Sequence, residues 1–245
     1  MSKKSSPDVA FFLVGGVDML GTLTQFSAEH EALLERTDVL GDAWETHGFI
    51  GRRKSEITQE GFYDDAAQSA HAALSTGPGV SKVMCYGLEG TATGAEVVGY
   101  EGAMQVNYTK LMDLGGLHKA KASYHGNGQV DAAKLLRTWK VAAATGASTG
   151  TPLDGLACST GGAGYVQYNS LAGEANLRIL HSSDNITYAA LFTFPKSTAS
   201  AEGLRMITTA MIERYVATDY TTATATGSVG NLTWMAALAR GIVSS

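Results

Sequence analysis

The sequence predicts an all-β protein with one short helix, built as a β-sandwich or barrel followed by a second β-sandwich. The 245 residues include 29 glycines but only 4 prolines, and each glycine inside a helix costs about 1 kcal/mol relative to alanine. Short runs rich in β-branched and aromatic residues recur along the chain, separated by Gly, Ser, Asp or Asn. Such spacing is typical of strands joined by turns.

The N-terminal region predicts a first strand and no membrane segment. Residues 9–14 form an apolar run that is shorter than a signal-peptide core and far shorter than a membrane span. The glycine-rich stretch that follows, "GGVDMLG", lacks the spacing and the lysine of a phosphate-binding loop. We therefore expect a tight turn at this stretch and no membrane partner.

Residues 57–74, "ITQEGFYDDAAQSAHAAL", predict a strand over 57–63 that turns into a helix over 65–74. Asp65, with Gln68 three residues later, resembles a capping box, and the glycines and proline of "STGPG" end the helix. We expect this helix to brace the outer side of the barrel through an aromatic side chain and a leucine. The brace residues are Phe62, Tyr63, Asp65 and Leu74.

The remaining segments also read as strands. Apolar and polar residues alternate over 103–108, which indicates a half-buried strand, whereas 131–140 fits a helix or a strand equally well. Asp184 and Asn185 tolerate positive φ, so "HSSDNIT" predicts a hairpin turn. Further strand-length segments are 175–183, 186–194, 203–217 and 231–240.

The composition changes near the middle of the chain. Residues 141–155 are mostly Ala, Thr, Gly and Ser without apolar periodicity, which is typical of a linker. Residues 1–128 carry 10 Lys+Arg and 16 Asp+Glu, whereas residues 129–245 carry 8 and 7. We predict a β domain over 8–140, a linker over 141–152 and a C-terminal β-sandwich domain over 153–245.

The sequence offers little that indicates catalysis or a cofactor. The six histidines form no HxH, HExxH or HxxxH pattern, and CxxC and GxSxG are absent from the sequence, so we expect no enzyme, metal or cofactor. Cys85 and Cys158 are too few for a disulfide scaffold and are interpreted as small core residues. The net charge of −5 argues against a protein that grips nucleic acid.

Aromatic residues leave a second function open. A row of exposed rings on a β-sandwich would suit a carbohydrate-binding or host-adhesion module, although packing inside the core explains the same residues. The aromatics concerned are Trp139, Tyr165, Tyr168, Tyr188 and Trp234.

Several motifs together resemble the siphophage major tail proteins, the tail-tube family. These are the opening "FFLVGGVDMLGTLTQFSAEHEALLERTDVLGDAW" and the later "ITQEGFYDDAAQSAH". The second half, from "TPLDGLACSTGGAGYVQY" to "LAR", resembles the C-terminal extension of many long-tailed phage tube proteins. The resemblance covers roughly residues 9–240.

The resemblance implies a structural virion protein, assembled in the host cytoplasm, whose rings stack into a tail tube for DNA ejection. The implied partners are further copies of itself, the tape-measure protein and passing DNA in the lumen, and the tail terminator and distal tail proteins. Some relatives carry two tube-fold domains and form trimeric rings. "GFYDD" has no counterpart in the second half, so we expect a hexamer with an outer second domain.

A lumen that passes DNA should repel phosphate, and the first half of the chain is the acidic half. We therefore expect acidic lumen residues on the strands over 52–62 and 96–108, namely Glu56, Glu60, Glu96 and Glu101.

The segment "ERTDVLGDAWETHG" corresponds in the family to a long loop that reaches the next ring. Trp44 lies there among charged residues, either as the anchor of a stacking contact or packed on its own sandwich. The proposed stacking residues are Glu35, Asp38, Asp42, Trp44 and Glu45.

Overall fold

The computed structural model consists almost entirely of strands. It describes residues 9–36, 47–63, 74–112, 116, 118–141, 151–169, 175–196, 201–222 and 232–241. Within these ranges the chain forms an 11-stranded sheet and a 4-stranded sheet. The expected all-β class is confirmed.

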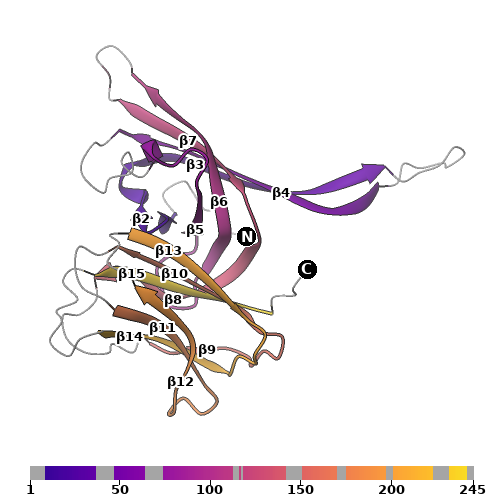
Figure 1. Cartoon of the computed structure of the whole chain (residues 1–245), viewed down its shortest axis with the longest axis vertical. Coiled ribbons are helices and arrows are strands. Elements are labelled where there is room, and N and C mark those ends of the chain that lie inside the picture. Colours follow the sequence, from indigo (N-terminus) through magenta and orange to yellow (C-terminus); the bar gives the residue numbers. More distant parts are fainter. Residues whose placement is uncertain are drawn as a thin grey trace, which may run out of the picture.

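Four antiparallel strands form the upper part of the large sheet (Figure 1). One face of these strands packs on a core that includes Phe12, Met84 and Tyr100. The 3-10 helix Leu20–Thr22 directly precedes the first of them. Their order is β3 (Leu23–Arg36), β4 (His47–Phe62), β7 (Lys119–Gly126) and β6 (Glu96–Leu111).

The rest of the large sheet curls into a nearly closed barrel in the middle of the molecule. The first half of β6 pairs on one side with β5 and on the other with β8. The remaining order is β13 (Ala201–Thr208), β10 (Gly162–Asn169), β15 (Thr233–Arg240), β8 (Val130–Val141), then β6, β5 (Ser81–Gly87), β1 (Phe11–Val14) and β2 (Val17–Asp18).

Both halves of the sequence fill this barrel. Its core combines Leu13 and Cys85 from the first half with Tyr165, Met235 and Ala237 from the second. The large sheet therefore contains strands from both sides of the predicted linker, with β8 paired to β15.

The second sheet lies below the barrel and covers its outer face (Figure 1). The core between them contains Tyr168, Phe194 and Trp234. The strand order is β12 (Ala189–Lys196), β11 (Ala175–Ser182), β14 (Tyr215–Thr222) and β9 (Leu153–Asp154).

Several local predictions are confirmed. Gly15 and Gly16 have φ values of 55° and 79°, as a tight turn after the first strand requires, and Asn185 has a φ of 61° in the β11–β12 turn. The ambiguous segment 131–140 is strand β8. The strand over 103–108 is confirmed, but its faces are reversed, because Met104 and Val106 are exposed and Gln105 is buried.

Two predictions need correction or lie outside the described residues. The segment 203–217 is not one strand, because β13 ends at Thr208 and β14 begins at Tyr215 in the other sheet. The helix predicted over 65–74 lies outside the described ranges except at its end, where Leu74 is helical. Among the described helices there is none with the length and apolarity needed to cross a membrane.

Candidate assembly surface

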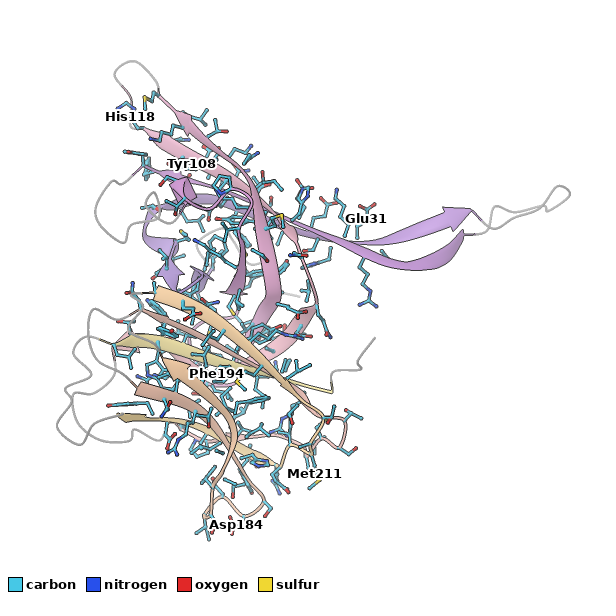
Figure 2. All side chains as sticks on the ribbon, viewed as in Figure 1. Glu31, Tyr108, His118, Asp184, Phe194 and Met211 are labelled. Atoms are coloured by element: carbon cyan, nitrogen blue, oxygen red, sulfur yellow. The ribbon has the colours of Figure 1, made fainter. Side chains whose placement is uncertain are left out.

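The sheet β3–β4–β7–β6, on which Glu31 and Tyr108 are labelled in Figure 2, has one buried face and one open face. Along β4, Ile57 and Gln59 are buried, whereas Glu56 and Glu60 are partly exposed. This period of two places the charged residues of "SEITQEG" on a single face, opposite the core. We call this surface the open face.

Residues of the open face form rows across the four strands. The register sets Gln25 beside Glu60 and Ser27 beside Thr58, and β7 and β6 continue these rows with Lys121 and Ser123, and with Thr109 and Asn107. The three middle rows therefore consist almost entirely of polar side chains. They are Gln25–Glu60–Lys121–Thr109, Ser27–Thr58–Ser123–Asn107 and Glu29–Glu56–His125–Met104.

Salt bridges balance the charge of the open face. Lys119 Nζ lies 2.8 Å from a Glu60 carboxylate oxygen, and its hydrogen bond is the main cause that lowers the pKa of Glu60. Lys54 Nζ lies 3.3 Å from Glu56, and His125 Nε2 lies 3.8 Å from the same carboxylate oxygen. These contacts give a hydrophilic surface of mixed charge.

The four glutamates predicted for the lumen do not gather at one place. Glu56 and Glu60 lie on the open face. Glu96 and Glu101 lie on the first half of β6, where Glu96 is 3.5 Å from Lys134 and Glu101 is 3.3 Å from Arg205. The structure thus brings two of the four to a common surface.

Both outer strands of this sheet have a free edge among the described residues. There, β3 pairs with β4 alone. Beyond Gln105, β6 pairs only with β7. A strand edge presents backbone N–H and C=O groups that another chain can pair with. The sheet therefore offers two such edges, one on each side.

The predicted stacking residues fall mainly outside the described ranges. Asp38, Asp42, Trp44 and Glu45 belong to residues 37–46, and of Glu35 only the backbone is described, in β3. The two strands that flank residues 37–46 form an antiparallel ribbon ending at the pair Arg36 and His47. The stacking role of these five residues stays a prediction.

The helix-brace residues have different surroundings. Leu74 is buried in the core below the open face, and its carbonyl accepts a hydrogen bond of 2.9 Å from Gln105 Nε2. The Tyr63 ring faces Lys110 Nζ at 5.2 Å, whereas Phe62 is 42% exposed. Asp65 lies outside the described residues, and the brace remains a prediction.

A buried polar cluster that the sequence did not reveal joins β8 of the first predicted domain to β10 and β13 of the second. Arg205 Nη2 on β13 lies 3.0 Å from Asp131 Oδ2 on β8, and Arg205 Nε donates to the Tyr165 hydroxyl at 3.0 Å. The Tyr165 hydroxyl itself donates to Asp131. These residues are 34 to 74 positions apart in sequence, so no local pattern marks them.

The aromatic residues do not form a sugar platform. Tyr165, Tyr168 and Trp234 are fully buried, and Trp139 and Tyr188 are half-buried. The interpretation as core packing is confirmed for the three buried rings. In the parts of the chain that the structure describes, no three His, Cys, Asp or Glu side chains gather as a metal site.

Comparisons with known proteins give similarity only at the level of solved structures. No protein-family model and no curated protein matches the sequence. A chain in the tail of an empty gene transfer agent particle, refined with C6 symmetry, is 15% identical with a TM-score of 0.43, over 53% of this chain and 98% of that chain. A chain in the virion of the native gene transfer agent particle is 13% identical with a TM-score of 0.39, over the same shares.

The third similar structure is the SPP1 Dit protein, described as a paradigm of the hub adsorption apparatus in phages that infect Gram-positive bacteria. It is 10% identical with a TM-score of 0.34, over 95% of this chain and 99% of that chain. Because the sequence identities and the TM-scores are this low, we infer the function from the geometry of the chain itself.

Proposed function

We propose that copies of this chain join into rings that stack as the tube of a phage-type tail, with the open face lining the bore. The observation that carries the proposal is the pair of free edges on β3 and β6. An edge on each side of one sheet allows the β6 edge of one copy to pair with the β3 edge of the next. Such head-to-tail pairing closes into a ring when the rotation between copies fits.

The chemistry of the open face suits a bore that DNA passes through. Unpaired cations on the wall would bind phosphates by releasing counterions and would slow the DNA. Here Lys119 and Lys54 already contact glutamates, and the middle rows add neutral Ser, Thr, Gln and Asn side chains. The open face would therefore hold DNA weakly. The bore proposed here carries mixed charge, with a small acidic excess, and is less acidic than the sequence suggested.

The resemblance to tail-tube proteins supplies the finer parts of the proposal. We propose that the ring is a hexamer, that the second sheet lies outside the bore wall, and that the tape-measure protein and DNA occupy the bore in turn. The tail terminator and distal tail proteins cap the two ends of the tube. The chain acts as a structural virion component without catalysis.

Negative-stain microscopy of the purified protein tests the proposal. Rings or tubes with a central hole are expected, and a protein that sediments as a monomer at every concentration would contradict ring formation. Dispersed monomers that bind glycans would instead favour the adhesion module.

A proline pair tests whether the free edge of β3 makes the ring. Successive N–H groups of a strand point to opposite sides, so one of Ser27→Pro and Ala28→Pro removes an N–H from the free edge and the other removes one from the β4 ladder. The variant that keeps the wild-type melting temperature is the edge variant. It should stay monomeric, and normal rings from it would show that β3 is not the ring contact.

A further inference from the structure

The strands β7 and β8 lie in line on the same side of β6. Ala103 of β6 pairs both with Lys82 of β5 and with Gly126 of β7, so β5 and β7 lie on opposite sides of β6. The first half of β6 likewise lies between β5 and β8. β7 and β8 therefore form one line from the upper part of the large sheet into the barrel (Figure 1), interrupted at residues 127–129. We call these three residues the joint.

The joint is a β-bulge. The flanking residues Gly126 and Val130 both pair with β6, which supplies two residues between their partners, whereas the joint supplies three. The Asn127 N–H donates to the Gly102 carbonyl at 2.8 Å and holds the first residue of the joint on β6. A bulge bends its strand and increases the local twist. The joint therefore affects the angle between the upper part of the sheet and the barrel.

The side chain of Glu101 fixes the other end of the joint. Its Oε2 accepts from the Gln129 N–H at 3.0 Å, and its Oε1 lies 3.3 Å from Arg205 Nη1. Arg205 also donates to Gln129 Oε1 at 3.2 Å. The same carboxylate lies against Gly128, because a Cβ at that position would be 2.8 Å from Glu101 Oε2. The joint is thus packed against a negative charge.

The joint contains the dipeptide Asn-Gly, which occurs only once in the sequence. In such a pair the backbone nitrogen of the glycine can attack the side-chain amide carbon of the asparagine, because the glycine has no Cβ to obstruct the approach. A bond from this nitrogen to Cγ forms and the Cγ–Nδ2 bond breaks, and ammonia leaves with the backbone amide proton. Water then opens the five-membered imide at either carbonyl, which gives aspartate or isoaspartate.

The structure leaves this pair open to the reaction. Asn127 and Gly128 are exposed and lie outside the strands, and among the described residues the Gly128 N–H has no hydrogen-bond partner. Asp154 and Gly155 could form the same imide, but their reacting groups are engaged. The Gly155 N–H donates to the Arg214 carbonyl at 3.0 Å, and the Asp154 carboxylate accepts from the Arg214 guanidinium at 2.7 and 2.8 Å. We therefore expect the joint to react first.

We propose that Asn127 is a site of spontaneous deamidation, and that this modification weakens the joint between the upper part of the sheet and the barrel. Isoaspartate carries the backbone through its side-chain carbon, so the chain gains one backbone atom between positions 127 and 128. Both products also add a negative charge to a segment that already contacts the Glu101 carboxylate, and like charges repel. The hydrogen bonds that hold the two ends of the joint on β6 are strained by both changes.

Mass spectrometry of aged protein tests the site. After storage of the folded protein at pH 8, the peptide with Asn127 should gain about one mass unit, because an amide becomes a carboxylate, and an isoaspartate methyltransferase should label it. Asn185 is the matched control, because the β-branched Ile186 follows it and obstructs the attack. Asn127 should react at least about tenfold faster than Asn185. Equal rates, or modification of Asn127 only in urea-unfolded protein, would overturn the proposal.

Two variants test the effect on the joint. Asn127→Gln keeps the amide but would need a six-membered imide, so it should resist deamidation, whereas Asn127→Asp has the added charge without the added backbone atom. Storage should lower the melting temperature of the wild type by about 2–4 °C, as for the loss of one backbone hydrogen bond in a chain of this size, and should leave that of Asn127→Gln unchanged. Fresh Asn127→Asp measures the share of the charge. An unchanged melting temperature in wild-type protein that is mostly deamidated would refute the weakening.

Discussion

Replacing Gly16 by alanine tests how the N-terminal turn joins the two halves of the chain. The Gly16 N–H donates to Gln167 Oε1 on β10 at 2.6 Å. A Cβ at this position would lie 2.1 Å from the Tyr168 carbonyl oxygen and 2.4 Å from the Glu202 amide nitrogen. Both obstructing atoms belong to backbone, so one of the strands would have to move.

The expected cost has two parts that a control separates. Gly16 has a φ of 79° and Gly79 a φ of 80°, and alanine in this left-handed region costs about 1–2 kcal/mol. A Cβ on Gly79 meets nothing within 4 Å, so Gly79→Ala should show that cost alone. Gly16→Ala adds the clash, worth about 1–3 kcal/mol by analogy with overpacked cores.

Chemical and thermal unfolding of the two variants measures the difference. The additional loss in Gly16→Ala corresponds to a melting temperature lower than that of Gly79→Ala by roughly 2–12 °C for a chain of this size. Equal unfolding free energies for the two variants would refute the idea that the turn is wedged between β10 and β13. A Gly16→Ala variant that unfolds in two steps would show that the turn couples the halves.

Three further predictions concern charged and reactive groups. Asp131→Asn should lower the unfolding free energy by about 1.5–3 kcal/mol in urea titrations, because it removes the buried anion that accepts from Arg205 and leaves the more exposed Glu101 as its charged partner. Asp154→Asn, in an exposed pair with Arg214, should have a much smaller effect. Backbone N–H groups of Thr187 and Ile186, with the Ser182 hydroxyl, lower the pKa of Asp184 from 3.8 to about 2. The stability from this lowered pKa is present above 3.8 and is lost as the pH falls to about 2, so Asp184→Asn should flatten acid unfolding curves over that window, and an unchanged curve would contradict the assignment. Burial raises the pKa of Cys85 to about 12, whereas hydrogen bonding with Thr160 lowers the pKa of the partly exposed Cys158, so a thiol reagent at pH 8 should modify Cys158 alone in the folded protein.

The sequence predicted those turns whose backbone conformation depends on the residue type at a single position. The positive φ at Asn185 and the turn at Gly15 and Gly16 follow from which residues tolerate that backbone region. The segment 131–140 could not be assigned from its period, because β8 packs against a different core on each face and buries residues on both. Its pattern therefore lacks the clean alternation of a half-buried strand.

The sequence could not predict contacts that depend on long-range register. Arg205 reaches Asp131 only because β13 and β8 lie on facing sides of the barrel. The residues next to each of them in sequence contain no pattern that predicts the ion pair. The four glutamates predicted for the lumen lie at two separate places for a similar reason, because the two halves of β6 pair with different strands of the large sheet. Glu101 and Met104 are close along the chain, and yet one meets Arg205 and the other lies beside His125.

Two sets of contacts in the central barrel fix the second half of the chain relative to the first. Gln167 on β10 accepts from the Gly16 N–H and donates to the Val83 carbonyl at 3.0 Å, so the first-half hairpin is tied to the second half at one seam. The cluster of Arg205 and Asp131 ties β13 to β8 at another. The attraction within a buried ion pair roughly offsets the free energy of removing both charges from water. Separating the two charges inside the protein is strongly unfavourable, because each is then buried without that attraction. A small rotation between the halves would break both sets of contacts together. We therefore expect the second half to keep one fixed orientation against the wall of the proposed tube.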